Sequence, residues 1–311
     1  MITTVVLNPA IDVRYSIDRF ELNKSHRCTH YQKTAGGKGL NVSRVLRILG
    51  DDVRATGFLG GNSGEFIAGE LHRLAIENRF VRIDEETRTC IAILSKDLTQ
   101  TEILESGPFI KKEFVDQFLT LYRKLLDDTT VISASGSLPR GLEDDFYSLL
   151  IEEAHKKRVK FVLDTSGLPL KKAIQARPFL IKPNQTELEQ LCGKKLSSEE
   201  DVIQQACELY FAGVENVLVS LGAAGAILVN REGVFKARIP KIQAINPVGS
   251  GDSMVAGFVH AISAHSDWEH ALRYACACGV ANAMEEETGK VNAETVREVL
   301  KKIDVFGAVS K

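Results

Sequence analysis

Cysteine is scarce in this sequence, and no two cysteines form a CxxC pair. A chain of 311 residues is long enough to bury a large core without disulfides, so we expect reduced thiols, as in cytoplasmic proteins. No apolar run approaches the roughly 20 residues that span a bilayer. Residues 1–12 also lack the basic segment and cleavage site of a secretory signal. We therefore expect a cytoplasmic protein with no membrane partner.

A clustered basic face is missing as well. The 39 Lys and Arg residues and the 41 Asp and Glu residues are spread along the chain and give a net charge of −2. Binding of nucleic acid would need a concentrated positive patch, so we expect no nucleic-acid partner. With 44% hydrophobic and 26% charged residues, the composition is typical of a soluble globular protein. No linker, repeat or low-complexity tract divides the chain, and we expect a single domain over residues 1–311.

Three familiar nucleotide-binding signatures are absent. There is no GxxxxGK[ST] loop of the Walker type. The dinucleotide pattern GxGxxG fails at Met254, where it requires glycine, which argues against a nicotinamide-dependent oxidoreductase. The HRD and DFG motifs of protein kinases are missing too.

Short β-rich runs alternate with amphipathic helical stretches along most of the chain. The predicted strands are nearly continuous in apolar residues, as expected when helices cover both faces of a mostly parallel sheet. Two segments, 12–34 and 88–105, instead alternate polar and apolar residues, and we expect them to form a small antiparallel β-layer attached to the main sheet. The strands are predicted at 2–7, 53–59, 130–135, 160–164, 179–182 and 216–220, and the helices at 38–49, 64–76, 111–126, 143–157, 184–192, 198–212, 251–264, 268–284 and 293–303.

The stretch NPVGSGDSMVAG, residues 246–257, combines glycines and a carboxylate at a predicted helix start. Gly249, Ser250 and Gly251 form a loop whose backbone N–H groups can point inward, because no glycine Cβ obstructs them. Together with the positive end of the helix dipole, these groups make an anion hole. Asp252 is then either an ordinary N-cap or a general base beside the hole, suited to phosphoryl transfer.

Two more glycine-rich stretches are open to two interpretations each. TAGGKGLNVSRVL is either a tight turn into the helix 38–49 or a place where the backbone approaches a small polar ligand, with Lys38 and Asn41 near the helix start. SLGAAGAILV, residues 220–229, is either an ordinary hairpin or a turn that passes close to a nucleotide. Asp12, in LNPAID, either forms a turn or accepts hydrogen bonds from sugar hydroxyls.

Several charged and polar residues also have a structural and a functional interpretation. Asn184 and Glu187 in KPNQTELEQL fit a capping box, or they lie near a magnesium–phosphate complex that Glu187 reaches through water. Arg88 in ETRTC is either a solvated surface charge or a clamp for a substrate phosphate. Ser137 in SGSLPRG follows a predicted strand, where loops commonly hold ligands. Arg27 is a weaker candidate for the same phosphate.

Taken in order, LNPAID, GGKGLNV, TRT, SGSLP, KPNxxE, SLGxxG and NPVGSGDS resemble the ribokinase-like (PfkB) family of sugar kinases. The resemblance covers essentially the whole chain. It implies a three-layer α/β/α sandwich with a small β-sheet lid, formed here by segments about 12–34 and 88–105, and a homodimer joined through the lids. One motif departs from the family, which often has GAGD where this chain has GSGD, but Ser250 still supplies a backbone N–H.

Within the family, TRTCIAIL, QTEILESGP and NPVGSGDS are most similar to kinases of phosphorylated ketohexoses. The resemblance implies that ATP, with Mg²⁺, phosphorylates the D-tagatose 6-phosphate of lactose and galactose metabolism to tagatose 1,6-bisphosphate. Fructose 1-phosphate is the nearest alternative acceptor, and fructose 6-phosphate comes third. A non-catalytic sugar-phosphate sensor is disfavoured, because Asp252 and the glycines of the loop are all present.

The resemblance also implies a role for each matching position. Asp252 is implied to be the catalytic base, and the N–H groups of residues 249–252 the anion hole. The sugar and its phosphate are assigned to Asp12, Gly37, Lys38, Asn41, Arg88, Ser137 and, from the partner's lid, Arg27. The nucleotide and Mg²⁺ are assigned to Lys182, Asn184, Glu187, Ser220, Gly222, Gly225 and, near the adenine, Asn282.

Overall fold

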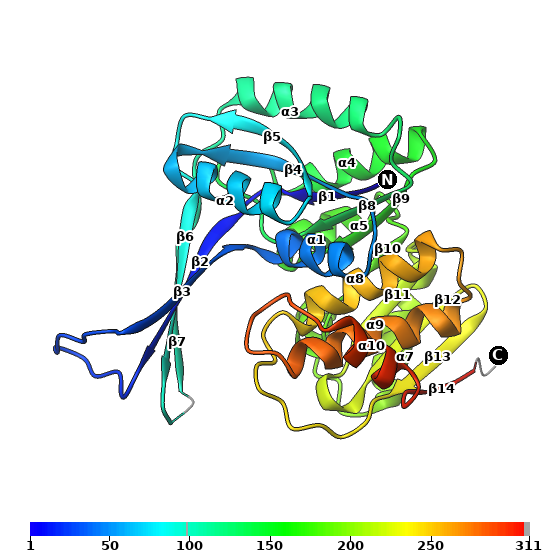
Figure 1. Cartoon of the computed structure of the whole chain (residues 1–311). Coiled ribbons are helices and arrows are strands. Elements are labelled where there is room, and N and C mark those ends of the chain that lie inside the picture. The colour runs from blue at the N-terminus through cyan, green and yellow to red at the C-terminus, as the bar shows by residue number, and fades with distance from the viewer. Residues whose placement is uncertain (98, 308–311) are drawn as a thin grey trace.

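The computed structural model describes residues 1–97 and 99–307, which form a large mixed sheet with helices on both faces and a smaller sheet that projects from this body (Figure 1). The strands of the large sheet are β1 (Ile2–Val6), β4 (Val53–Gly60), β5 (Glu77–Ile83), β8 (Val131–Ser135), β9 (Lys160–Asp164), β10 (Leu180–Ile181), β11 (Asn216–Ser220), β12 (Ala226–Asn230), β13 (Gly233–Arg238) and β14 (Asp304–Phe306). Their order is β14-β13-β12-β11-β10-β9-β8-β1-β4-β5. The strands from β11 to β5 run parallel, and β12, β13 and β14 are antiparallel to their neighbours.

Two layers of helices cover the large sheet. One layer contains α1 (Lys38–Ile48), α2 (Gly61–Arg73), α8 (Ser250–Ser263), α9 (Trp268–Ala283) and α10 (Ala293–Leu300). The other contains α3 (Lys112–Leu125), α4 (Phe146–Lys156), α5 (Gly167–Ile174), α6 (Gln185–Cys192) and α7 (Glu199–Phe211). Successive strand residues face opposite layers, so Val6 of β1 joins the first core and Val5 the second. The predicted α/β/α sandwich is confirmed.

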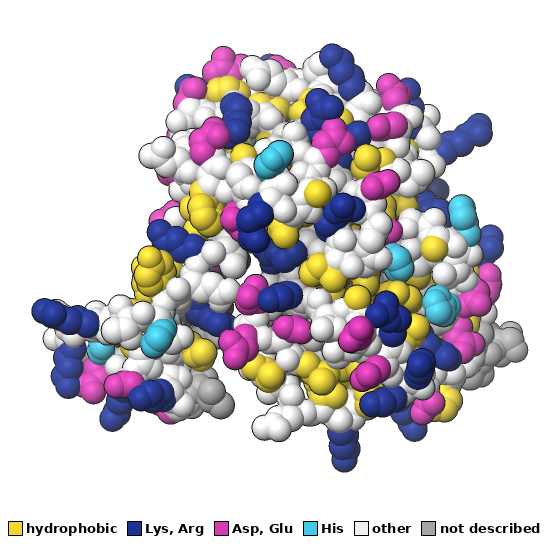
Figure 2. Space-filling model, viewed as in Figure 1, with side chains coloured by type: hydrophobic (Ala, Val, Ile, Leu, Met, Phe, Trp, Pro, Cys, Tyr) yellow, Lys and Arg dark blue, Asp and Glu magenta, His cyan; other side chains and the backbone are white. Residues whose placement is uncertain are grey.

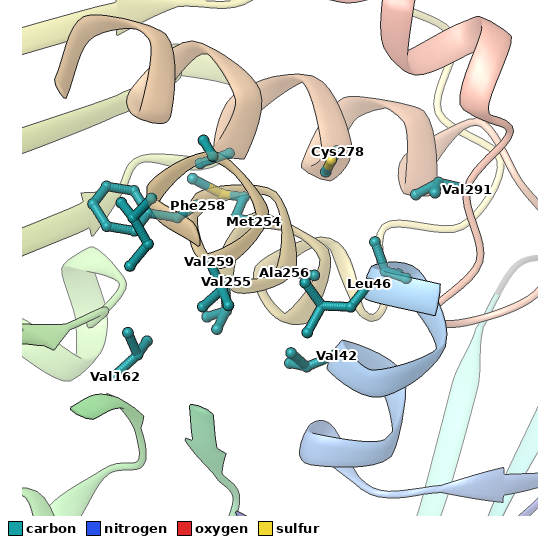
Figure 3. Close-up of a cluster of buried hydrophobic side chains, with 14 of the residues drawn as sticks. Val42, Leu46, Val162, Met254, Val255, Ala256, Phe258, Val259, Cys278 and Val291 are labelled. Atoms are coloured by element: carbon teal, nitrogen blue, oxygen red, sulfur yellow. The ribbon is translucent and has the colours of Figure 1, made fainter. Parts of the chain in front are cut away.

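The helix α8 is buried between α1, α9 and the sheet (Figure 3). Val42 and Leu46 of α1 pack toward one side of it, and Cys278 of α9 lies on another. A Cβ on Gly257 would lie only 2.6 Å from the carbonyl oxygen of Tyr274, so the two helices approach as closely as backbone allows. This packing fixes the N-terminus of α8, which carries the GSGD motif.

The smaller sheet has four strands in the order β3-β2-β6-β7. They are β2 (Ala10–Ile17), β3 (His30–Gly36), β6 (Arg88–Ser95) and β7 (Gln100–Leu104). We expected antiparallel pairing, but the central pair, β2 with β6, is parallel over eight residues. The reason is that β2 continues from β1 and β6 from β5, and β1 and β5 point the same way in the large sheet. These strands lie in the predicted lid segments, of which position 98 falls outside the described residues, as do 308–311.

Some elements differ from the sequence-based expectations. The helix α5 was not predicted, because Gly167 and Pro169 stand at its start; proline is tolerated there, since the first turn needs no N–H donor. The edge strand β5 was missed because its alternating charges do not read as a buried strand. The strands β13 and β14 were also missed, and the strand predicted at 179–182 shortens to β10. No helix among residues 1–97 and 99–307 is long and apolar enough to cross a membrane.

Candidate active site

Several residues of the site lie at or just beyond the carboxyl ends of strands that meet at one edge of the large sheet. Ser137 lies just beyond β8 and Lys182 just beyond β10, while Asp164 ends β9 and Ser220 ends β11. The chain runs outward in both directions from β1, toward β8 on one side and β4 on the other, which creates the switch point where open α/β sheets bind ligands. The space-filling view shows a hollow between this body and the projecting sheet, with charged side chains along its rim (Figure 2).

The GSGD loop provides the start of α8. Gly249 is the N-cap and has a φ of 82°, in the left-handed region that favours glycine. The helix begins at Ser250, one residue earlier than predicted, so Asp252 is its third residue and not its N-cap. Ser250 donates its N–H to the carbonyl of Pro247 at 3.2 Å, and the first α-helical bond runs from Ser253 to Gly249 at 2.9 Å. The N–H groups of Gly251 and Asp252 precede that bond and are available to an anion.

The carboxyl group of Asp252 is buried and held by an amide. Asn41 of α1 donates from Nδ2 to Oδ2 of Asp252 at 2.8 Å, and the aspartate is only 6% exposed. Burial, and then the negative charge of Asp164, raise the pKa of Asp252 to about 6, although Lys38, Asn41 and Lys182 oppose the shift. A carboxyl group with this pKa is ionised at neutral pH and can still accept a proton efficiently, as a general base requires.

Asp164, which was not among the predicted site residues, organises two lysines. It is 1% exposed, and its two carboxylate oxygens lie 3.3 Å from the Nζ of Lys38 and 3.5 Å from the Nζ of Lys182. Burial alone would raise the pKa of Asp164, but Lys182 and Lys38 together hold it below its ordinary value. A Cβ on Gly251 would lie 3.2 Å from the same Nζ of Lys182, so this ammonium group borders the anion hole. The sequence feature that could have identified Asp164 as a site residue is its place at the end of KFVLD, a predicted buried strand.

Arg88, Asn8 and Ser137 form a hydrogen-bonded group where the small sheet joins the large one. Arg88 donates from Nε and Nη2 to the carbonyl oxygen of Asn8, at 3.2 and 3.0 Å, and from Nη1 to the carbonyl of Glu105 at 2.9 Å. Asn8 in turn donates from Nδ2 to Oγ of Ser137 at 3.2 Å. The structure therefore brings Arg88 and Ser137 together through Asn8. The sequence interpretation did not select Asn8, although this residue stands in the LNPAID motif.

Asp12 extends from β2 toward the start of α1. A Cβ on Gly36 would lie 2.0 Å from Oδ2 of Asp12, so only glycine leaves space for this carboxyl group. Burial raises the pKa of Asp12, while the backbone N–H of Gly37 and the positive charges of Arg88 and Arg44 partly offset the shift. Gly37 is the N-cap of α1, with a φ of 96°. This arrangement places Asp12 beside the helix that carries Lys38 and Asn41.

Arg27 is not brought to the other phosphate-binding candidates within this chain. It is exposed and lies in the connection from residue 18 to 29, between β2 and β3, which forms the outer end of the projecting sheet (Figure 1). Any role in a site requires a second copy of the chain, as the sequence interpretation already assumed.

The loops after β10 and β11 lie side by side. Asn184 forms an isolated parallel bridge with Ser220, and Ser220 donates its N–H to the carbonyl of Pro183 at 3.1 Å. The 220–229 stretch is a hairpin around a 3₁₀ turn (Gly222–Ala224). A Cβ on Gly225 would lie 1.9 Å from the carbonyl oxygen of Ala237, so this position admits only glycine for packing reasons.

Asn184 and Glu187 form the capping box that their spacing predicts. The side-chain oxygen of Asn184 accepts from the N–H of Glu187, and Oε2 of Glu187 accepts from the N–H of Asn184, both at 2.8 Å. The carboxylate is thereby fixed at the start of α6. Its negative charge also raises the pKa of Lys38, and the charge of Asp164 has the larger effect in the same direction.

Asn282 supports the GSGD loop. Its side chain is fully buried; Nδ2 donates to the carbonyl of Val248 at 2.9 Å, and Oδ1 accepts from Oγ of Ser253 at 3.1 Å and from the N–H of Gly289 at 2.9 Å. A contact of this amide with adenine would break these hydrogen bonds. These hydrogen bonds assign Asn282 to the support of the loop, and its position near the adenine stays a prediction.

Comparison with known proteins gives concordant results. The pfkB family carbohydrate kinase pattern matches residues 5–295. A tagatose-6-phosphate kinase of Staphylococcus epidermidis is 41% identical over 309 residues, which cover 98% of this chain and 99% of the relative.

Solved structures show the same architecture over nearly the whole chain. Phosphofructokinase-2 from Escherichia coli, in complex with fructose 6-phosphate, has a TM-score of 0.89 at 26% identity and covers 97% of this chain and 98% of its own. A Thermotoga maritima protein described as a possible 1-phosphofructokinase has a TM-score of 0.90 at 28% identity and covers 99% of both chains. These matches confirm the expected phosphotransferase class, with an alcohol group as acceptor. The chain belongs to the pfkB family of carbohydrate kinases.

Proposed function

We propose that this kinase transfers the γ-phosphoryl group of ATP to O1 of D-tagatose 6-phosphate and produces tagatose 1,6-bisphosphate. The observation that carries the proposal is the buried carboxyl group of Asp252, held by Asn41 at the N-terminus of α8. The identity of 41% to a tagatose-6-phosphate kinase over 98% of the chain supports this choice of acceptor.

Asp252 is the general base of the proposed reaction. Its carboxylate accepts the proton of the O1 hydroxyl as the bond from O1 to phosphorus forms. The bond from the γ-phosphorus to the bridging oxygen breaks at the same time, and ADP leaves with that oxygen. General-base assistance of this kind contributes a factor of about 10²–10⁴ to the rate.

The start of α8 stabilises the phosphoryl group in transit. The N–H groups of Gly251 and Asp252, with that of Gly249, face the charge that develops on its oxygens, and the helix dipole adds to their effect. Lys182 supplies a full positive charge beside Gly251, and Asp164 keeps its ammonium group in place.

The residues present fit a magnesium ion that is carried mainly by the nucleotide. In the described part of the chain, no three His, Cys, Asp or Glu side chains are grouped so as to hold a metal ion alone. Mg²⁺ in kinases commonly keeps several waters and uses one or two carboxylates besides the phosphates. Glu187, fixed at the start of α6, is the carboxylate that would hold it through water. When bound, Mg²⁺ neutralises charge on the phosphates.

Arg88 and Ser137 bind the 6-phosphate of the acceptor. Arg88 uses three of its five N–H groups within the chain, and the two that remain are available to phosphate oxygens. Arg27 of the partner subunit completes this phosphate site. Asp12, Gly37, Lys38 and Asn41 contact the sugar itself.

The nucleotide lies over the loops that follow β10 and β11. Ser220, Gly222 and Gly225 line it on one side, with Lys182 and Asn184 near its phosphates. Ile245, Val248 and Met284 are exposed hydrophobic residues next to the GSGD loop and suit the apolar faces of a purine. Ile245 and the end of α9 are joined by a 2.7 Å hydrogen bond from its N–H to Ala283.

Two chains associate through the projecting sheets. Tyr31 and Ile103 expose 64% and 55% of their surface on the face of this sheet opposite to Asp12, and all of β7 is exposed. Large apolar side chains exposed on one face are best explained by a covering partner. Sedimentation of the native chain is expected to give a dimer that Ile103→Asp converts to monomers. A native monomer at assay concentration would contradict this.

ATP use and six unpaired cysteines fit a cytoplasmic location.

The acceptor is tested by comparing kcat/KM for D-tagatose 6-phosphate, fructose 1-phosphate and fructose 6-phosphate, with ADP release as the measurement. We expect the highest value for D-tagatose 6-phosphate. A preference for fructose 1-phosphate would instead indicate 1-phosphofructokinase activity. This is the activity named in the description of the Thermotoga maritima neighbour. No ADP release with any of the three would overturn the proposed function and leave a sugar-phosphate sensor.

A further inference from the structure

Arg44 lies one helical turn after Asn41 and is not among the residues assigned to the sugar, its phosphate or the nucleotide. Within residues 1–97 and 99–307, the hydrogen bonds of its guanidinium group go to neutral oxygens: Nη1 donates to Oδ1 of Asn41 at 3.3 Å and to the carbonyl of Thr288 at 2.9 Å, and Nη2 donates to the carbonyl of Ala35 at 2.5 Å. Burial lowers the pKa of Arg44, and the negative charges of Asp12, Glu287 and Glu70 oppose the shift. Arg44 therefore also acts on the charge of Asp12, but no step of the proposed reaction assigns it a contact with a substrate.

The contact with Asn41 determines which way the asparagine amide points. An arginine has donors and no acceptor, so it can bind only the oxygen of that amide. The NH₂ group is then directed to the opposite side, where it donates to Oδ2 of Asp252 at 2.8 Å. If the amide turned by about 180°, its oxygen would face the carboxylate, and the hydrogen bond would be replaced by repulsion.

A second set of contacts leads from Arg44 to the GSGD loop. Nη1 also lies 3.4 Å from the carbonyl oxygen of Gly289, whose N–H donates to Asn282. A Cβ on Gly249 would lie 2.8 Å from that same nitrogen of Gly289, so the 288–289 turn packs directly against the N-cap of α8. Arg44 thus holds both the amide that binds the base and the turn that supports the anion hole.

We propose that Arg44 is a positioning residue of the phosphoryl transfer, which fixes the amide of Asn41 toward Asp252 and the 288–289 turn against Gly249. This inference rests on the proposed role of Asp252 as the base. The largest charged influences on Asp252 are Asp164 on β9, Lys38 on α1 and Lys182 after β10, and substitution of Arg44 leaves these three in place. Loss of the Arg44 charge would itself raise the pKa of Asp252, so the part of the change that is absent in an Asn41→Leu background reports on the amide of Asn41.

The test compares Arg44→Met with Arg47→Met. Arg47 lies on the same helix but donates to the carbonyl of Asp51, away from the site. We expect Arg44→Met to lower kcat at least about 10-fold, to change KM for ATP less than about threefold, and to move the acid limb of the kcat/KM profile to higher pH. In an Asn41→Leu background the same substitution is expected to lower kcat by a smaller factor than in the native background, because its effect through that amide is already lost while its effect through the 288–289 turn remains. Arg47→Met is expected to match the native enzyme.

Native kcat and an unmoved acid limb in Arg44→Met, or full additivity with Asn41→Leu, would overturn the inference. Arg44→Lys retains a charge and a donor, so it serves as the test if Arg44→Met fails to fold. It is expected to shift the acid limb of the kcat/KM profile in the same direction by a smaller amount. An unmoved acid limb with a reduced kcat would overturn the inference as well. Asp252→Asn distinguishes a failure of the proposed function from a failure of the role proposed for Arg44. An active Asp252→Asn enzyme contradicts the proposed function, whereas an inactive one with a normal Arg44→Met enzyme contradicts only the role of Arg44.

Discussion

Asn41 and Asp252 are joined by a 2.8 Å hydrogen bond across 211 positions of the sequence. The bond connects α1 to α8 at the point where the acceptor hydroxyl loses its proton in the proposed reaction. We predict that Asp252→Asn lowers kcat at least about 10²-fold, because the general base is lost while the backbone of the loop is kept. ATP binding, measured by calorimetry, is expected to survive. Turnover near the native rate would show that another group takes the proton.

The raised pKa of Asp252 predicts how activity and stability depend on pH. The base must be ionised, so kcat/KM should fall as the pH drops below about 6. Stability has the opposite sign: the folded pKa lies above the ordinary 3.8, so the contribution of Asp252 is fully present below about pH 4 and is lost as the pH rises through about 6.

The neutral Asp252→Asn variant should therefore gain stability relative to the native chain at high pH, by about 1–3 kcal/mol. Thermal unfolding at pH 5 and pH 8 measures the effect. We expect the Tm advantage of the variant to be larger at pH 8; an equal advantage at both values would show that ionisation of Asp252 does not oppose folding.

Arg88→Ala should mainly weaken binding of the sugar phosphate. The guanidinium group holds Asn8 and offers its remaining donors to phosphate, and such a contact is equally strong in the ground and transition states. We expect KM for the acceptor to rise about 10-fold or more with a smaller change in kcat. Arg82→Ala, which removes an exposed arginine paired with Glu65, is the matched control. A reduced kcat with an unchanged KM would contradict the phosphate clamp.

Asp164→Asn tests the aspartate that the sequence interpretation missed. Loss of its charge removes the partner of Lys38 and Lys182, so we expect KM for ATP to rise about 10-fold. The acid limb of kcat/KM should move to lower pH, because Asp164 is one cause of the raised pKa of Asp252. Asp128→Asn removes an ion pair with Arg54 elsewhere and serves as the control. An unchanged ATP KM would mean that the lysines hold their places without Asp164.

The sequence predicts the layers of this fold well, because buried parallel strands are almost wholly apolar, as in ITTVV of β1. It predicts β5 poorly, because Arg79 and Arg82 on this edge strand face solvent and pair with Glu77 and Glu65. The direction of β6 relative to β2 depends on which strands they continue, a property of the whole topology that no local pattern contains.

The site shows the same division. Glycines such as Gly249 and the capping box of α6 can be predicted because they satisfy local backbone requirements. Asp164, Asn8 and Arg44 could not be selected, since their roles arise from partners far away in the sequence: Lys38 for Asp164, Ser137 for Asn8 and Thr288 for Arg44.

Asp12 and Arg88 belong to the projecting sheet, whereas Asp252 belongs to the helical body. In the proposed function the acceptor therefore takes contacts from both units, because Lys38 and Asn41 belong to the body as well. We expect such an enzyme to hydrolyse ATP slowly while no sugar is present. Turnover should also respond to changes far from the chemistry, because a substitution that alters how the sheet meets the body moves Asp12 and Arg88 relative to the base.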